Sequence, residues 1–269
     1  MRKRNRNITY KQARKALFDS YNERVLEDSL NPDSEDYFFG SVDRWSMVIE
    51  ELSRNNQKGN ILDIGANDGI FCGALKKLGF SAAAMDLYKV ADNYIWDKLG
   101  IEFHQCHIEA DPIPFPDEYF NGIYMGQLLE HFTYSPRSPF KEILRVLKSG
   151  GIFIFDVPNV GELHNYYRLI RGKNILYDYK THYIDYEPYF YKGRPFFERH
   201  NREFTPNELV VLAKTCGFEV IKVGYIRSRR LFKKGMRRFE IPFSMLRDLI
   251  PIFRKTIMIT TRKPIAGAQ

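Results

Sequence analysis

Two carboxylates and a glycine turn give the clearest chemical signal in the sequence. Residues 60–78, N-I-L-D-I-G-A-N-D-G-I-F-C-G-A-L-K-K-L, place Asp63 at the end of an apolar run and Gly65 and Gly69 in the turn that follows. Glycines there let backbone N–H groups approach a ligand and permit the positive φ angles of a sharp reversal. A carboxylate at that position repels a pyrophosphate but suits an ammonium group. Asn67 also stands where the dinucleotide fingerprint G-x-G-x-x-G has its second glycine. The turn therefore predicts a cationic nucleoside as ligand.

The second carboxylate is Asp86, which ends the small, apolar run of residues 81–85. In nucleotide-binding α/β folds, an acid about 20 residues beyond the glycine turn accepts hydrogen bonds from the ribose hydroxyls. The apolar spacing around the turn predicts a strand, then a helix, then the strand that Asp86 ends. We therefore expect an α/β fold whose ligand lies at the carboxyl ends of the strands.

Several further segments, in order along the chain, resemble the class I S-adenosylmethionine-dependent methyltransferases. The turn D-I-G-A-N-D-G is similar to that family's first motif, and H-I-E-A-D-P-I-P-F-P-D-E-Y-F-N-G-I-Y is similar to its third and fourth strands. G-Q-L-L-E-H-F and I-L-R-V-L-K-S-G-G-I-F-I-F-D-V-P-N resemble the segments that follow. The resemblance covers roughly residues 58–160, with a weaker echo to about 225. It implies S-adenosylmethionine as the cofactor.

The resemblance also implies which residues contact the cofactor. Asp86 binds the ribose, Gln127 lies beside the methionine portion, and Ile108 covers the adenine ring. Either His107 or Glu109 makes the polar contact to the exocyclic amine. The complete set implied for the cofactor is Asp63, Gly65, Ala66, Asn67, Gly69, Asp86, Leu87, His107, Ile108, Glu109 and Gln127.

The expected architecture is a three-layer Rossmann-like α/β fold with a mostly parallel seven-stranded sheet and helices on both faces. At 269 residues, the chain suits one such domain with additions. We expect N-terminal helices in residues 1–57, one of them a lid over the cofactor by the resemblance. The S-adenosylmethionine-binding core follows in residues 58–160. An aromatic-rich insertion after strand five fills residues 161–204, and residues 205–269 complete the fold and carry a basic insert.

Local signals predict two helix ends. Thr205-Pro206-Asn207-Glu208 is typical of a helix N-terminus, with Thr205 as the cap and Glu208 three residues later. The glycines of K-S-G-G, residues 148–151, suit a left-handed cap. We therefore expect them to end the helix of residues 139–147.

The insertion is rich in tyrosine and histidine and shows no sustained helical or strand period. Aromatic rings with polar tips suit sugar rings, flat phenols or stacked bases. We interpret this region as the acceptor-binding site, with an aromatic subdomain that packs on itself as the alternative. A hydroxyl acceptor must lose a proton, and an imidazole titrates near neutrality. The candidate bases are His182 and His200 in the insertion, and His131 after the fourth strand.

Glu130 and His131 allow three interpretations. They are structural, or His131 is a general base, or the pair binds a metal ion. In a branch of the family that methylates the 3′ end of small RNAs, E-x-x-E-H supplies metal ligands. Gln127 replaces the first acid of that motif here. We therefore expect no metal.

The net charge of +8 is concentrated in residues 2–6 and in the segment Arg227–Arg238. Either cluster could contact phosphate groups or an anionic membrane, or could be a solvated face. The sequence has no signal-peptide core and no run of 18 apolar residues. Its three cysteines lack metal or redox spacing, which favours reduced thiols. We expect a cytoplasmic protein, with peripheral membrane contact as an option.

The leading functional hypothesis is O-methylation of a small or glycan-type acceptor, such as a sugar of a surface polysaccharide or its lipid-linked precursor. An RNA methyltransferase is the rival enzyme, although no RNA-binding module is recognisable. A non-catalytic partner with the same fold is the third alternative. The intact Asp63, Gly65, Gly69 and Asp86 favour an active enzyme.

Overall fold

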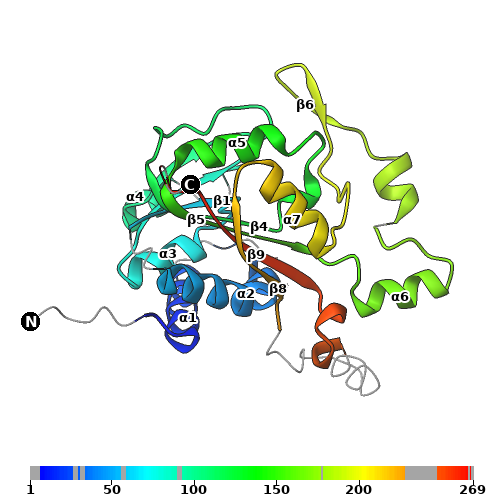
Figure 1. Ribbon diagram of the computed structural model, residues 1–269, viewed down its shortest axis with the longest axis horizontal. Coiled ribbons are helices and arrows are strands. Elements are labelled where there is room, and N and C mark those ends of the chain that lie inside the picture. The colour runs from blue at the N-terminus through cyan, green and yellow to red at the C-terminus, as the bar shows by residue number, and fades with distance from the viewer. Residues whose placement is uncertain are drawn as a thin grey trace, which may run out of the picture.

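The protein forms three layers, a seven-stranded sheet between two layers of helices (Figure 1). The computed structural model describes residues 7–26, 30, 34–55, 59–89, 93–176, 178–227, 247–265 and 267. No helix in these ranges is long and apolar enough to cross a membrane. Of the basic segment Arg227–Arg238, all residues but Arg227 lie outside the described ranges, as do residues 2–6.

The sheet has the strand order β3-β2-β1-β4-β5-β9-β8. The strands are β1 (Asn60–Ile64), β2 (Ser81–Asp86), β3 (Glu102–Gln105), β4 (Phe120–Gly126), β5 (Leu147–Pro158), β8 (Glu219–Tyr225) and β9 (Thr256–Arg262). The first five are parallel, and β9 runs antiparallel between β5 and β8. The strand order reverses between β1 and β4, the position where open α/β sheets bind their ligands. The predicted Rossmann-like fold is confirmed.

Both faces of the sheet are covered by helices. The helices are α1 (Tyr10–Leu26), α2 (Ser34–Arg54), α3 (Ile70–Lys77), α4 (Asn93–Leu99), α5 (Arg137–Val146), α6 (Leu163–Ile170) and α7 (Pro206–Thr215). On one face, Leu17 of α1 and Phe38 of α2 pack in the same apolar core as Ile61 of β1. On the other face, Phe140 of α5 and Leu209 of α7 share a second core. These two cores fix the strands whose ends form the site.

One predicted helix cap is confirmed and the other is wrong. At α7, the Thr205 hydroxyl accepts from the Glu208 N–H at 3.4 Å, and the Glu208 carboxylate accepts from the Thr205 N–H at 2.8 Å. By contrast, α5 ends at Val146, and Leu147 is already extended. Gly150 has a φ of 73°, but it lies inside β5. Its positive φ accommodates the irregular register at the start of the β4–β5 pair.

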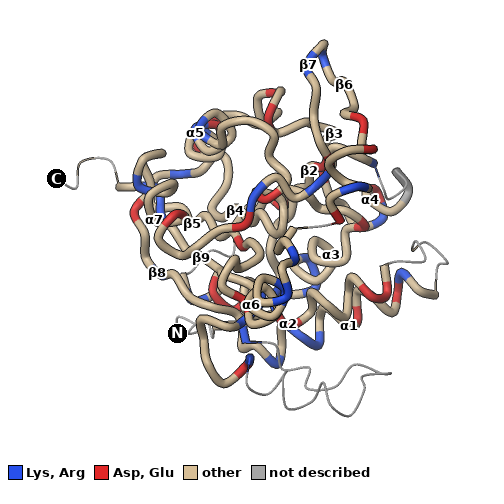
Figure 2. The backbone as a smooth tube through the Cα atoms, turned by 90° about the vertical axis from the view of Figure 1, so that its right-hand side faces the viewer, with Lys and Arg blue, Asp and Glu red and all other residues tan. Residues whose placement is uncertain are grey.

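The insertion contains short elements that project from the carboxyl edge of the sheet (Figure 1). They are α6, a π-helix η2 (Lys180–Ile184) and the hairpin of β6 (Tyr189–Tyr191) and β7 (Arg194–Phe196). Figure 2 shows Lys and Arg at the tip of this hairpin. Strands of three residues are too short to give a recognisable period, so the sequence pattern did not reveal the hairpin.

Candidate active site

The glycine turn between β1 and α3 has the conformation that the sequence predicts. Gly65 and Gly69 have φ values of 83° and 77°. The N–H groups of Gly65 and Ala66 donate to the Met85 carbonyl at 2.8 and 3.2 Å, which ties the turn to β2. A Cβ added to Gly65 would meet nothing nearer than 3.7 Å, whereas one added to Gly69 would lie 2.7 Å from the Trp96 ring. A Cβ at Gly65 would thus lie in van der Waals contact with the Leu128 side chain, whereas Gly69 allows close packing of α4.

Asp86 stands at the end of β2, next to this turn. Its two carboxylate oxygens accept from the backbone N–H groups of Asn67 at 2.9 Å and Tyr88 at 3.1 Å. Burial raises the pKa of Asp86 to about 6, so the group is ionised at neutral pH. Each oxygen keeps a lone pair for a further donor. The neighbouring Leu87 carbonyl accepts from the Gln105 side chain at 3.0 Å, which holds this loop against β3. The arrangement fits a ribose with two hydroxyls.

Asp63 lies beneath the turn and is only 3% exposed. Its carboxylate accepts from the Cys72 thiol at 3.5 Å. Burial raises the pKa of Asp63 to about 7. The carboxylate is thus part of the support under the turn, and its contact with an ammonium group stays a prediction.

The loop after β3 is covered by the hairpin of the insertion. The His107 ring lies 4.0 Å from the Phe196 ring, centroid to centroid, and its Nε2 is 3.0 Å from the Tyr189 hydroxyl. The Glu109 carboxylate accepts from two backbone N–H groups of the loop beyond β4, at 2.8 and 3.2 Å. Ile108 is buried in the apolar core. Both polar candidates for the adenine contact therefore have protein partners, and the choice between them stays open.

Gln127, at the end of β4, belongs to a buried network that the sequence analysis missed. It has a φ of 52°, and its side-chain amide donates to the Asp156 carboxylate at 2.8 Å. Asp156 also accepts from the Tyr124 hydroxyl at 2.8 Å and from the Arg44 guanidinium at 3.0 Å. Arg44 and Asp156 are 7% and 1% exposed. The available signal was a carboxylate within the apolar run I-F-I-F-D-V, because a buried carboxylate requires partners.

Glu130, His131 and His200 form a cluster beyond β4. The first two lie in a 3-10 helix, η1 (Leu129–His131), and His200 comes from the end of the insertion. The two imidazole rings are 4.7 Å apart. Burial raises the pKa of Glu130 to about 8 and lowers the pKa of His131. Burial and the neighbouring His131 lower the pKa of His200 to about 4. His182 lies in η2 outside this cluster, and its carbonyl accepts from the Arg199 side chain at 2.7 Å.

Residues 196–204, which we call the crossing segment, run past the ends of neighbouring strands. The Glu198 carboxylate accepts from the Tyr88 hydroxyl in the loop after β2. The Asn201 N–H donates to the Glu130 carbonyl at 2.8 Å, beyond β4. The crossing segment therefore joins the side of the site that holds Asp86 to the side that holds the cluster.

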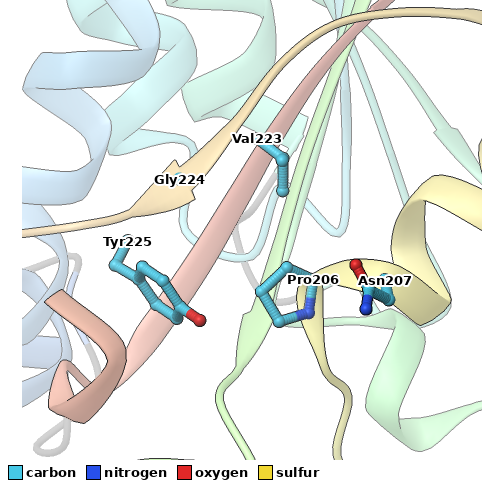
Figure 3. A pocket seen from close by; sticks show the side chains of 5 residues that line it. All are labelled: Pro206, Asn207, Val223, Gly224 and Tyr225. Atoms are coloured by element: carbon cyan, nitrogen blue, oxygen red, sulfur yellow. The ribbon is translucent and has the colours of Figure 1, made fainter.

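A separate pocket of about 350 Å³ lies between the start of α7 and the end of β8 (Figure 3). It is lined by Pro206, Asn207, Val223, Gly224 and Tyr225. In the sheet, β5 and β9 lie between β8 and β4. None of the candidate cofactor or catalytic residues lines it, so it is distinct from the site at β1, β2 and β4.

The strand order, the glycine turn after β1 and the acid at the end of β2 together define the class I S-adenosylmethionine-dependent methyltransferase fold. A sequence model of the methyltransferase domain matches residues 40–223. The chain belongs to this methyltransferase domain family, and S-adenosylmethionine is the cofactor that the family implies. The positive φ of the glycine turn and the two accepting oxygens of Asp86 fit that cofactor.

Known proteins similar to the chain include a ubiquinone/menaquinone biosynthesis C-methyltransferase of Methylococcus capsulatus. The two are 27% identical over 145 residues, 51% of this chain and 56% of that protein, so the match spans about half of the relative.

Among solved structures, one similar chain comes from a complex of the Haloferax volcanii Trm112 methyltransferase activator with a methyltransferase. Its TM-score is 0.60 at 16% identity, and the match covers 86% of this chain and 95% of that one. Another is the Burkholderia thailandensis 1,6-didemethyltoxoflavin-N1-methyltransferase, with S-adenosylhomocysteine bound. Its TM-score is 0.54 at 15% identity, with 94% and 88% covered. At these identities the solved structures support the fold alone.

Proposed function

We propose that the protein transfers a methyl group from S-adenosylmethionine to a hydroxyl of a small or glycan-type acceptor. A sugar of a surface polysaccharide, or its lipid-linked precursor, is the acceptor class that we favour. The observation that carries the proposal is the cluster of Glu130, His131 and His200 beyond β4. Its side chains are of types that can activate a hydroxyl. It lies at the carboxyl ends of the strands, where such folds bind their ligands.

The chemistry explains why this cluster favours a hydroxyl acceptor. The cofactor supplies a methyl group on a sulfonium, which is a good leaving group. The protein must align the acceptor and exclude water, and proximity supplies much of the rate. A hydroxyl must also lose its proton, a step that a positioned side chain accelerates by about 10²–10⁴-fold. An amine acceptor that is already neutral needs no such group before attack. We assign the activation of the hydroxyl to the cluster.

The exposed aromatic residues of the insertion support a sugar or another flat acceptor. Some tyrosines are engaged in the fold, such as Tyr183, whose hydroxyl donates to the His200 carbonyl at 2.7 Å. Tyr166, Tyr167 and Tyr179 are 47%, 47% and 66% exposed. Exposed aromatic rings with polar tips can stack on a sugar ring and bond its hydroxyls. We propose that the acceptor is recruited by rings of this kind.

RNA is the second candidate acceptor. It is supported by the net charge of +8 and by the basic tip of the β6–β7 hairpin, where Lys192 and Arg194 lie (Figure 2). We also propose, from the sequence alone, that the segment Arg227–Arg238 contacts phosphate groups or an anionic membrane at the cytoplasmic side.

The test is transfer of a radiolabelled methyl group from S-adenosylmethionine into an extract of the source organism. The extract is divided into RNA, lipid-plus-glycan and small-molecule fractions, and an Asp86→Ala variant is the control. We expect label in the second or third fraction that disappears in the control. Label confined to RNA would replace the proposal with the second candidate. If no fraction is labelled and S-adenosylhomocysteine does not bind, the non-catalytic alternative is favoured.

A further inference from the structure

The geometry of the cluster brings together three side chains of the types that bind metal ions. Glu130, His131 and His200 each offer one ligand atom, and these atoms all lie within 4.8 Å of one another. Neighbouring ligands of a transition ion lie about 3 Å apart, since each is about 2.0–2.2 Å from the ion. Small side-chain rotations therefore suffice to bring all three atoms onto one ion.

Glu130 is the group in this cluster that most requires a partner. Its side chain belongs to a residue that is 1% exposed, and within the described part of the chain neither carboxylate oxygen has a hydrogen-bond partner. An isolated buried carboxylate is costly, and buried charges are normally paired or bound to a metal. A cation between Glu130 and the two imidazoles would satisfy both oxygens where the fold supplies no donor.

Hydrogen bonds to backbone carbonyls hold the chain at Glu130, His131 and His200. The Asn201 N–H donates to the Glu130 carbonyl at 2.8 Å, and the Asn201 side chain donates to the His131 carbonyl at 3.0 Å. The Tyr183 hydroxyl fixes the His200 carbonyl from the other side at 2.7 Å. The crossing segment is thus attached to η1 at the point where His200 meets Glu130 and His131. These bonds fix the backbone positions from which the three side chains project.

We propose that Glu130, His131 and His200 bind a divalent first-row transition ion. Two imidazole nitrogens and one carboxylate oxygen suit Zn²⁺, Mn²⁺, Fe²⁺ or Co²⁺ better than Mg²⁺ or Ca²⁺, which prefer oxygen alone. Three protein ligands leave positions open for a substrate, as in catalytic zinc sites. The sequence analysis expected no metal because Gln127 interrupts the acidic motif. Gln127 bonds Asp156 instead, and the third ligand comes from His200, far along the chain.

The role of the ion follows from the proposed function, on which this step rests. An ion at the cluster would bind the acceptor hydroxyl and lower its pKa. The proton then leaves to solvent, and an oxygen lone pair forms the new bond to the methyl carbon. The carbon–sulfur bond breaks, and its electron pair stays on sulfur. In this arrangement His200 serves as a ligand of the ion and the ion activates the hydroxyl.

The test is titration of the chelator-treated full chain with CoCl₂, followed by visible absorption and calorimetry. We expect one Co²⁺ per chain. The variants Glu130→Gln and His200→Ala should weaken binding by at least about tenfold. His164→Ala, another histidine of the insertion, lies outside the cluster and should bind Co²⁺ as the wild type does. Binding of S-adenosylhomocysteine by each variant verifies that the fold is intact.

The outcomes separate this inference from the proposed function. Wild-type protein that binds no Co²⁺, or a Glu130→Gln variant with unchanged Co²⁺ affinity, would overturn the metal site. If chelator-treated protein still methylates a hydroxyl acceptor at the full rate, the proposed function stands and the ion is rejected. Co²⁺ bound at the cluster together with label in RNA alone would preserve the site and reject the glycan acceptor.

Discussion

Replacing Arg44 with Met should destabilise the protein strongly, because it leaves a buried charge without compensation. The Arg44–Asp156 pair has side chains only 8% and 0% exposed, with a separation of 3.0 Å. In Arg44→Met, the Asp156 carboxylate keeps two neutral donors, Tyr124 and Gln127, but no cation. Breaking a buried ion pair in this way costs about 3–5 kcal/mol of the free energy of unfolding. The loss should also loosen Gln127, which is implied to lie beside the cofactor.

The matched control is Arg54→Met on the same helix, α2. Arg54 pairs with Glu50 at 3.0 Å, but its side chain is 51% exposed, so solvent screens the pair. This change should cost about 0.3–0.5 kcal/mol. Urea unfolding followed by circular dichroism measures both variants. Adding Asp156→Asn to Arg44→Met should recover part of the loss, because it removes the unpaired charge. Equal costs for the two arginine variants, or no recovery in the double variant, would refute this reasoning.

Three further predictions concern ligand binding at Asp86, the packing at Gly69 and the cap of α7. Burial raises the pKa of Asp86 to about 6. If ribose hydroxyls bond its ionised form, as the resemblance implies, affinity for S-adenosylhomocysteine should fall about tenfold from pH 7 to pH 5. Calorimetry at each pH measures it, and Asp86→Asn should remove this step. Gly69→Ala combines a positive φ with a contact to Trp96 and should cost about 2–3 kcal/mol, whereas Gly79→Ala, with no atom within 4 Å, should cost about 1 kcal/mol. Thr205→Ala removes the capping box and should cost about 1 kcal/mol, measured by urea unfolding.

Each of these expectations has a contradicting result. Affinity that is flat between pH 5 and pH 7 would show that Asp86 does not bind the ligand in its ionised form. Equal destabilisation by the two Gly→Ala changes would remove the argument that Trp96 crowds Gly69. A Thr205→Ala variant as stable as the wild type would mean that water replaces the cap without cost.

Features encoded by adjacent residues could be predicted from the sequence. The glycine turn and the cap at Thr205 depend on residues only a few positions apart, so their types and spacing reveal the geometry. The mostly parallel seven-stranded sheet followed from ordered motifs that resemble a known family. The cap of α5 was predicted wrongly because the same glycines suit either a helix cap or an irregular strand. Only the pairing of Leu147 with Phe120 decides between them.

Features built from residues distant in sequence could not be predicted. The Arg44–Asp156 pair joins α2 to β5, and no local pattern identifies the partner of a buried acid. His200 approaches Glu130 only because the insertion folds back over the sheet edge. Several tyrosines of the insertion form hydrogen bonds with other parts of the protein, as Tyr189 does with His107. Composition indicated the kind of contact that these rings make, but not whether the contact is with a ligand or with the protein.

The crossing segment has a consequence for the order of substrate exchange. Glu198 contacts the loop beside Asp86, and Asn201 contacts Glu130, so one short stretch of chain borders both halves of the site. A movement of residues 196–204 that admits one substrate must alter the surroundings of the other. We therefore expect sequential kinetics in which each substrate changes the dissociation rate of its companion. Independent binding and release of the two substrates would require that different segments cover the two halves of the site, whereas residues 196–204 contact both.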